Sequence, residues 1–512
     1  MTMRFVSALV LLLLPAIVTA QRFQINETSI ADVHAAIRGG SLTCHALVQS
    51  YLDRIARYDK QGPAINAITV VNPDALTVAD SVDRRFAATR QLTGPLHCVP
   101  FIVKDNFQTI GLQTAAGNIA LKGYAPTKDA FQVRRIKEAG AIVLAKSNMA
   151  EFAFSPYETV NSVLPGYTRN PYSLDRVTAG SSGGTAAAVA SDFGEVGLGT
   201  DTGNSIRGPS SHQALVGIRS TMGLTSRAGI APLSLFADIA GPMARTVADA
   251  AAVLQVVAGY DPDDPVTEAA RAHPIPNYSA SLVRDGLKGA RIGVLRQAFE
   301  GPTVDPEVRA IFNRAIDDLR KAGATVLDTV IIAESDSIRR SGPRGGCNPF
   351  RAEFDAWLAQ NPAAPVKTVE QIFRSRQYHP SIEARLGSAV NDTTNIETAP
   401  ACVARQRIRE GLRDAVTQTM DRLHLDALIY PTWSNPPRLI GDLNTPAGDN
   451  SQVFSPTTGM PAITVPMGWS RNNALPAGMT IFGRAFDEAR LLRLAYGYEQ
   501  ATHWRRQPAS VP

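Results

Sequence analysis

Cysteines, runs of like charge and long apolar segments are all scarce in this 512-residue sequence. Its four cysteines include no CxxC pair, which argues against a zinc site. Its 51 basic and 46 acidic residues give a net charge of +5, and no five like charges are consecutive. Nucleic-acid binding is therefore not supported, because phosphate contacts need clustered Lys and Arg. Beyond the N-terminus, no apolar stretch is long enough to cross a membrane.

The first 20 residues have the pattern of a signal peptide. Arg4 precedes a largely apolar run over residues 5–14, and Val18-Thr19-Ala20 forms a typical cleavage site before Gln21. We therefore predict that residues 1–20 are removed and that the protein is secreted or periplasmic, with no stable membrane insertion after cleavage. The alternative, an uncleaved membrane anchor, would also place the protein outside the cytoplasm.

All four cysteines follow this segment, so an oxidising compartment would permit two disulfides with three possible connectivities. We favour Cys44 with Cys98 and Cys347 with Cys402, because each pair falls within one region of the chain. Separate buried thiols are the alternative.

The order of apolar patterns predicts an α/β domain. Helical spacing covers residues 30–37 and 43–58, and a buried strand over 99–103 is followed by a helix at 131–139 and a strand at 141–145. Later, strands at 291–295, 325–331, 426–430 and 462–465 alternate with helices at 306–322, 403–423 and 488–501. No linker rich in Pro, Gly or Ser divides this series. Between about Ser335 and Pro400 the pattern loosens, and we expect either loops that shape a substrate site or a surface excursion without function.

Two glycine-rich loops carry serines a short distance apart. Gly180-Ser181-Ser182-Gly183-Gly184 precedes an apolar, helix-like run, and Ser205 lies near the centre of Gly199–Pro209. A Gly/Ser loop that opens a helix presents free backbone N–H groups, which suit developing negative charge. A third feature is Lys104, at the end of the apolar run over 99–103. Each feature alone is common, but the three together at this spacing are not.

In this combination the chain resembles the amidase signature family. The family's hallmark is a GSSGG loop, a GTD-x-GGS-I-R loop whose serine lies 24 residues after the first, and a lysine after an apolar strand; Ser205 follows Ser181 by the same 24 residues. The segments Gly94–Pro100, Gly241–Asp249 and Gly459–Pro466 match as well. The resemblance implies one large α/β domain over residues 27–508, with a mixed sheet flanked on both faces by helices.

The resemblance also implies a mechanism for hydrolysing the C–N bond of a small, linear amide, without a metal or organic cofactor. Ser205 would attack the carbonyl and form an acyl-enzyme, Ser181 would relay the proton, and Lys104 would be the base. Lys104 must then be neutral, which requires burial to lower its pKa. Backbone N–H groups of Thr202, Gly203, Asn204 and Ser205 would hold the oxyanion.

Other residues have two interpretations. Asp201 and Arg207 are either a structural ion pair or a pair that fixes the serine loop. Phe152 and Phe154, in a segment that resembles the family's acyl pocket, are either pocket walls or core. Asn204 and Cys98 stand where the family usually has glycine; if position 204 needs a positive φ, Asn is among the least strained replacements. We expect Asn204 to affect the substrate range more than catalysis.

Four other functions compete with an amidase. A carbamate- or ester-cleaving enzyme of the same family remains open. Gly180–Gly184 also satisfies G-x-S-x-G, which would make Ser182 the nucleophile of an α/β-hydrolase-type esterase, but that motif requires a strand directly before it and residues 172–179 are polar. A non-catalytic binding protein has little support while all three triad positions are present. A role within a complex that modifies charged tRNA is disfavoured by the export signal and the absence of a basic patch.

Overall fold

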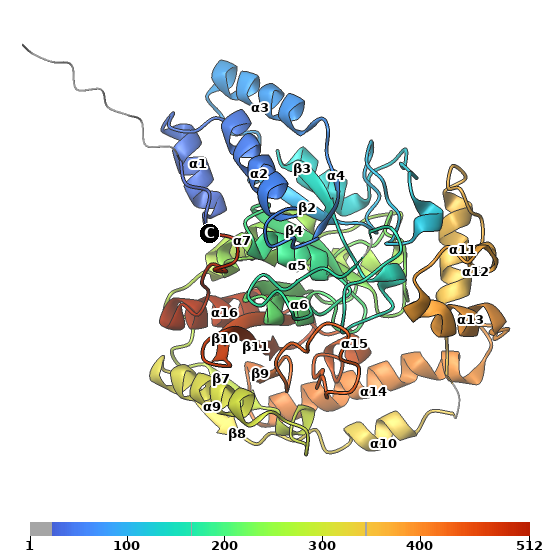
Figure 1. Ribbon diagram of the computed structural model, residues 1–512. Coiled ribbons are helices and arrows are strands. Elements are labelled where there is room, and N and C mark those ends of the chain that lie inside the picture. Colours follow the sequence, from blue (N-terminus) through green and yellow to red (C-terminus); the bar gives the residue numbers. More distant parts are fainter. Residues whose placement is uncertain (1–22, 165, 344–345) are drawn as a thin grey trace, which may run out of the picture.

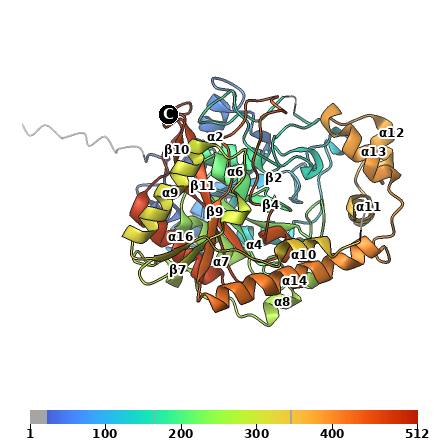
Figure 2. The same cartoon turned by 90° about the horizontal axis from the view of Figure 1, so that it is seen from below.

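A computed structural model describes residues 23–512 except 165 and 344–345, so the predicted signal peptide lies outside the described residues. Its centre is one 11-stranded sheet with the strand order β1-β3-β2-β4-β6-β5-β10-β11-β9-β7-β8 (Figure 1). The β2–β3, β2–β4, β7–β8 and β7–β9 pairs are parallel and the other pairs are antiparallel. Helices cover both faces of the sheet, as the view from below also shows (Figure 2). The predicted single α/β domain with a mixed sheet is confirmed.

The strands are β1 (Ile68–Val71), β2 (Pro100–Lys104), β3 (Ile142–Ser147), β4 (Val196–Asp201), β5 (Val216–Arg219), β6 (Ile239–Ala244), β7 (Arg291–Val294), β8 (Thr325–Asp328), β9 (Ala427–Pro431), β10 (Ala462–Ser470) and β11 (Leu475–Phe482). The helices are α1 (Ile30–Arg38), α2 (Cys44–Tyr58), α3 (Ala75–Thr89), α4 (Phe131–Glu138), α5 (Gly183–Ala190), α6 (Arg207–His212), α7 (Val247–Val257), α8 (Glu268–Arg271), α9 (Pro306–Lys321), α10 (Ser335–Arg340), α11 (Phe350–Gln360), α12 (Val369–Ser375), α13 (Glu383–Asn391), α14 (Pro400–Arg422), α15 (Ser455–Thr458) and α16 (Glu488–Thr502). Among the described residues, no helix is both long and apolar enough to span a membrane.

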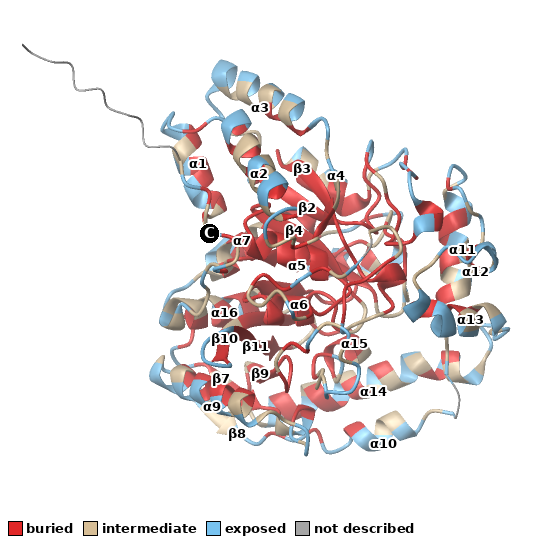
Figure 3. Cartoon of the chain, in the orientation of Figure 1, coloured by how far each residue is buried: buried red, intermediate tan, exposed pale blue. Residues whose placement is uncertain are grey.

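Alternation along β2 explains how a lysine comes to end a buried strand. Phe101 and Val103 join the large core that includes α4, α7, α9 and α16, whereas Ile102 joins the core on the opposite face with α1, α2 and α5. Successive side chains of a strand point to opposite faces, so Lys104 lies on the same face as Ile102. This is the α5 face, where the buried region is continuous (Figure 3).

The segment expected to be loose is mostly helical, which corrects that expectation. It forms α10 to α13, and α11 to α13 lie together to one side of the sheet (Figures 1 and 2). Phe350 and Trp357 of α11 pack in a separate core with Tyr124, Phe152 and Phe154. These four helices are short and separated by segments with Pro and Gly, so no long helical period marks them in the sequence. Packing on a shared aromatic core stabilises α11 to α13.

Both favoured disulfides are present. Cys44 pairs with Cys98, with Cα atoms 5.6 Å apart, and Cys347 pairs with Cys402, with Cα atoms 5.0 Å apart. Cys98 has a φ of 59°, which is in the left-handed region that favours glycine. This backbone conformation explains why a glycine suits position 98, and the disulfide requires a side chain there.

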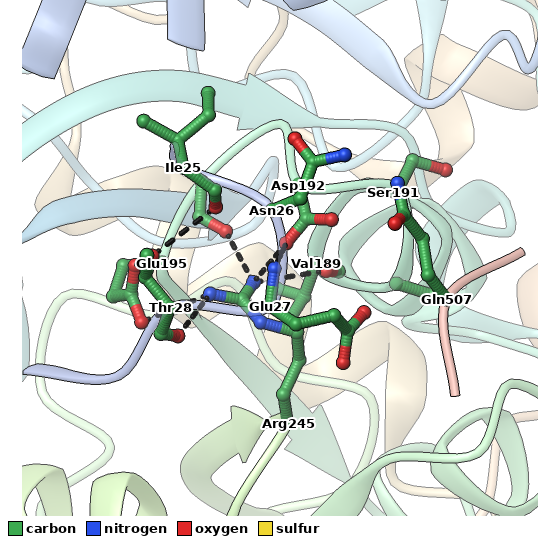
Figure 4. A network of polar contacts seen from close by, with 12 residues as sticks. Ile25, Asn26, Glu27, Thr28, Val189, Ser191, Asp192, Glu195, Arg245 and Gln507 are labelled. Carbon is green, nitrogen blue, oxygen red and sulfur yellow. Dashed lines mark hydrogen bonds and ion pairs between the residues drawn. The ribbon is translucent and has the colours of Figure 1, made fainter. Parts of the chain in front are cut away.

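A buried ion-pair network joins the start of the described chain to the far end of α5 (Figure 4). Arg245 lies 3.2 Å from Asp192 and 2.9 Å from Glu195, and all three side chains are at most 2% exposed. Arg245 also donates to the carbonyl of Thr28, and Glu195 accepts from the hydroxyl of Tyr51. Burial raises the pKa of Glu195 to about 7, although Arg245 opposes this.

We predict that Arg245→Met lowers the free energy of unfolding by about 3–5 kcal/mol, because it leaves two buried carboxylates without their cation. Urea unfolding followed by circular dichroism at pH 8 and pH 6 measures the loss. The loss should be larger at pH 8, because protonation of Glu195 relieves the uncompensated charge at pH 6. The control is Arg320→Met, which breaks an exposed pair with Asp317 and should cost less than about 1 kcal/mol. Equal losses in the two variants would contradict the network's role.

Candidate active site

Lys104 is fully buried at the carboxyl end of β2. Its Nζ lies 2.8 Å from Ser181 Oγ and 2.7 Å from Thr200 Oγ1. Thr200 lies on β4, which pairs directly with β2, and also accepts from Asn106 Nδ2 at 3.2 Å. The pairing of β2 with β4 therefore brings Lys104 and Thr200 together although they are 96 positions apart in the sequence.

Burial sets the protonation of this lysine. Desolvation lowers the pKa of Lys104 to about 7, while Asp238 and Asp201 act in the opposite direction. No carboxylate forms an ion pair with Lys104 within the described residues. A substantial fraction of this amine is consequently neutral near pH 7 and able to accept a proton.

The loop that carries Ser181 is held by tight backbone packing. The N–H of Gly180 donates to the carbonyl of Pro156, and the N–H of Ala150 donates to the carbonyl of Ser181. A Cβ on Gly180 would lie 2.6 Å from the carbonyl oxygens of Ser155 and Glu158, so only glycine fits there. The Gly180–Ser181 peptide bond is cis.

The hydroxyl of Ser182 is hydrogen-bonded to the backbone of β4. It donates to the carbonyl of Thr200 at 3.1 Å and accepts from the N–H of Thr200 at 3.3 Å, and neither bond involves a histidine. No strand directly precedes this serine in the described segment 166–182. The geometry does not fit the nucleophile elbow of an α/β-hydrolase, which requires both a preceding strand and a histidine partner.

Ser205 lies in the loop between β4 and α6 and is 5% exposed. The N–H of Ser182 donates to the carbonyl of Ser205 at 3.3 Å, so the two serine loops are joined directly. Within the described chain, the backbone N–H groups of Thr202, Gly203, Asn204 and Ser205 donate to no other protein group. Four unpaired donors in the loop that carries Ser205 are able to bind an oxyanion.

Asp201 organises this loop through two arginines. Arg207 and Arg219 contact its carboxylate at 3.0 Å and 3.1 Å, and all three side chains are fully buried. Burial alone would raise the pKa of Asp201, but the two guanidinium groups and the N–H of Ile206 lower it to about 2. Arg207 also donates to the carbonyl of Gly203 at 2.7 Å. The sequence suggested the pair of Asp201 with Arg207 but gave no sign of Arg219.

Asn204 does not adopt the left-handed conformation, so the backbone reason considered for asparagine at this position does not apply. Its side chain instead reaches the loop before α15, where Nδ2 donates to Asp449 Oδ2 at 2.8 Å. Arg207 donates to the carbonyl of Ser451 in the same loop. Asn204 therefore connects the Ser205 loop to the loop before α15.

The two aromatic candidates lie in different places. Phe154 lines a cavity of about 370 Å³ that Thr202 of the Ser205 loop also lines. Phe152 is only 2% exposed and packs behind Phe154, with ring centroids 5.7 Å apart. The cavity is completed by residues from the loop before β6 and from the α11–α13 block: Leu233, Ser234, Cys347, Asn348, Pro349, Phe350, Arg385 and Ala389. The sequence indicated the segment over residues 335–400 as one that could shape a substrate site, but it did not single out which of its residues line the cavity.

Two buried polar residues near Lys104 were also missed. Asn106 follows β2 by two positions and bonds Thr200, and Asp238 accepts from the hydroxyl of Thr202 and from the N–H groups of Leu233 and Ser234. Burial raises the pKa of Asp238. Asn106 could have been found from the Lys104-Asp105-Asn106 motif, whereas no local pattern marks Asp238. Among the described residues, no three His, Cys, Asp or Glu side chains are grouped to hold a metal ion.

Comparisons with known proteins agree with this geometry. The family model named Amidase matches residues 46–492. A glutamyl-tRNA(Gln) amidotransferase subunit from Synechococcus sp. (strain JA-2-3B'a(2-13)) is 32% identical over 94% of this chain and 94% of its own length. A probable amidase of Arabidopsis thaliana is 32% identical over 96% of this chain and 93% of its own. The crystal structure of peptide amidase from Stenotrophomonas maltophilia superposes with a TM-score of 0.83 at 34% identity, covering 94% of this chain and 98% of that one. This chain therefore belongs to the amidase signature family of amide hydrolases.

Proposed function

We propose that this protein hydrolyses small, linear carboxylic amides through a seryl acyl-enzyme, with Ser205 as nucleophile, Ser181 as proton relay and Lys104 as base. The observation that carries the proposal is the 2.8 Å contact between the buried Nζ of Lys104 and Ser181 Oγ. A lysine in water is charged and a poor base, but the pKa of Lys104 is lowered to about 7. The backbone bond from Ser182 to Ser205 holds the two serine loops together, which supports placing the relay beside the nucleophile.

Each step of the mechanism assigns a bond and a proton. Neutral Lys104 accepts the proton of Ser181, and Ser181 accepts that of Ser205 as Ser205 Oγ bonds to the carbonyl carbon. Negative charge develops on the carbonyl oxygen, where the unpaired N–H groups of residues 202–205 stabilise it. The relay then returns the proton to the departing nitrogen as the C–N bond breaks. A water molecule then attacks the acyl-enzyme ester through the same proton relay and releases the carboxylic acid.

Rigid support of the nucleophile loop favours the same proposal. Asp201, held by Arg207 and Arg219, fixes the loop from within. Asn204 and Arg207 fix it against the loop before α15. Oxyanion donors are effective only when they are already oriented, because reorganisation during the reaction would cost free energy.

We also propose that the protein acts outside the cytoplasm, as a secreted or periplasmic enzyme. Two features support this: the signal-peptide pattern of residues 1–20 and the two disulfides, which persist in oxidising compartments. The relatives named for charged tRNA share the fold, but this chain has no cluster of basic residues in its sequence to suit that substrate.

A substrate panel tests the proposal. The purified protein is incubated with matched amides, esters and carbamates of the same acyl groups, and kcat/KM is measured for each. Hydrolysis of the amides supports the proposed function. Turnover of carbamates or esters but not of amides would instead support a carbamate- or ester-cleaving enzyme. If no substrate is turned over and a fluorophosphonate does not label Ser205, the protein is not a serine hydrolase.

The Cys347–Cys402 disulfide should control substrate binding, because Cys347 is part of the cavity wall. We predict that Cys347→Ser with Cys402→Ser raises KM by about threefold to tenfold for amides with large acyl groups, since the Cys347–Phe350 wall is no longer tied to α14. The expected size corresponds to roughly 1 kcal/mol of binding free energy. Steady-state kinetics with a small and a large acyl group measures the effect.

The matched control is Cys44→Ser with Cys98→Ser. The two disulfides join residues 54 and 55 positions apart, so their removal should destabilise the protein through loop entropy to a similar extent, about 2–5 kcal/mol. Of the four cysteines, Cys347 alone lines the cavity. If both double variants raise KM equally, the effect is general destabilisation and the prediction fails.

A further inference from the structure

The cavity beside the Ser205 loop contains a cation. Arg385 on α13 lines it together with Ala389, one turn further along the same helix. The guanidinium lies over the ring of Phe154, 4.6 Å from its centroid, and Nη1 donates to the carbonyl of Phe154. These two contacts hold the guanidinium at the cavity wall, and Arg385 is at the same time exposed to solvent.

Arg385 has no acidic partner among the described residues. Glu383, two positions earlier on α13, pairs instead with Arg376. Partial burial lowers the pKa of Arg385, and no carboxylate offsets this. Within the described chain, the Nε and Nη2 groups of Arg385 donate to no protein atom. The cavity therefore contains an oriented guanidinium with unused donors.

The rest of the cavity wall is mainly apolar and leads to the nucleophile loop. Phe154, Leu233, Pro349, Phe350 and Ala389 supply the apolar surface. Thr202, the first residue of the proposed oxyanion loop, lines the same cavity, and its hydroxyl is already used by Asp238. Asp238 itself does not line the cavity. An acyl chain that extends from Ser205 into this space would meet apolar surface and then one uncompensated positive charge.

We propose that this cavity binds the acyl part of the substrate and that Arg385 recognises a carboxylate at its far end. The preferred substrates are then monoamides of dicarboxylic acids. The inference rests on the proposed function and deepens it. A guanidinium presents parallel N–H donors that match a carboxylate. The apolar wall selects a hydrocarbon spacer between the two ends.

Two variants separate the charge of Arg385 from its contact with Phe154. Arg385→Gln removes the charge but keeps an N–H donor for the Phe154 carbonyl, and Arg385→Lys keeps the charge. The readout is the ratio of kcat/KM for an ω-carboxylate amide to that for its methyl ester, over a series of spacer lengths. We expect the ratio to fall roughly 10- to 100-fold in Arg385→Gln, the range for a charge-assisted hydrogen bond, and to be largely retained in Arg385→Lys. Added salt should lower the wild-type ratio.

Arg374→Gln is the matched control, because Arg374 is an exposed arginine of the neighbouring α12 that pairs with Glu370 and does not line the cavity. Its ratio should equal that of the wild type. A second measurement, calorimetric binding of adipate to wild type and Arg385→Gln, does not depend on turnover. An unchanged ratio or equal adipate binding in Arg385→Gln would overturn the inference while leaving amide hydrolysis intact. If the wild type hydrolyses no amide but its adipate binding still depends on Arg385, the proposed function is refuted and the carboxylate site is not.

Discussion

Replacing Lys104 with methionine is expected to lower kcat by about 10²- to 10⁴-fold, which is the contribution expected of a general base. Methionine has nearly the same length and suits a fully buried site, but it cannot accept a proton from Ser181. Steady-state kinetics with the best amide of the panel measures the loss. An esterase that used Ser182 would keep most of its activity in this variant, so the result separates the two mechanisms.

The pH dependence of the wild type provides a second readout for Lys104. Its pKa in the folded protein is about 7, so kcat/KM should rise with pH, reach half its maximum near pH 7 and level off above. Below this pKa, each unit of pH should lower kcat/KM about tenfold. A profile that stays flat from pH 5 to 9 would contradict a neutral Lys104 as the base.

The lowered pKa of Lys104 also makes stability depend on pH. The pKa of Lys104 is lowered from 10.5 to about 7, so the unfolded chain binds the proton more tightly. The free energy of unfolding contributed by this group therefore falls as pH decreases from about 10.5 to about 7, and is constant below that. At pH 8, Lys104→Met should have a Tm equal to or above that of the wild type. Lys122→Met, at an exposed lysine, is the control and should change neither activity nor Tm.

Ser205→Ala is expected to lower kcat by about 10⁴-fold or more and to abolish labelling by a fluorophosphonate, since no covalent intermediate can form. Residual turnover would come from binding and the oxyanion donors alone. Mass spectrometry of the labelled wild type should place the adduct on Ser205. Ser181→Ala should also lose most of its activity, because the proton of Ser205 then has no route to Lys104.

Ser211→Ala is the matched control for Ser205. Ser211 lies on α6, six positions after Ser205, and is also buried, but its hydroxyl has no hydrogen-bond partner within the described residues. Its removal should leave labelling, kcat and the free energy of unfolding essentially unchanged. Labelling that persists in Ser205→Ala, or that disappears in Ser211→Ala, would contradict the assignment of the nucleophile.

The parts of the fold that were predictable have strong local patterns. The helix that begins at Cys44 follows the cap residue Thr43, whose hydroxyl accepts from the N–H of Ala46, and its apolar residues recur at helical spacing. β2 is a short, wholly apolar run up to its final lysine. In contrast, β4 and β6 contain Gly or Pro, so their sequences resemble loops, and only pairing with each other makes them strands.

The candidate site likewise contains residues that the sequence motifs indicated and residues that they did not. The motifs indicated Ser181, Ser205 and Lys104, and the structure places Lys104 in contact with Ser181; their catalytic roles stay a prediction until the variants are measured. Arg219 and Asp238 carry no motif, because their contacts with the serine loop depend on how β5 and the loop before β6 pack. Phe152 and Phe154 looked equivalent, yet only Phe154 reaches the cavity.

The sequence by itself determined the family, the alternation of helices and strands, and the spacing of the two serine loops, because these depend on residues close to one another in the chain. Only the tertiary structure decided the protonation of Lys104, the pairing of Asp201 with Arg219 as its second arginine, and the unpaired guanidinium of Arg385. These properties depend on how much water is removed from a group and on which distant charges surround it. Lys104 and Thr200 are 96 positions apart, and they meet because β2 and β4 are neighbours in the sheet.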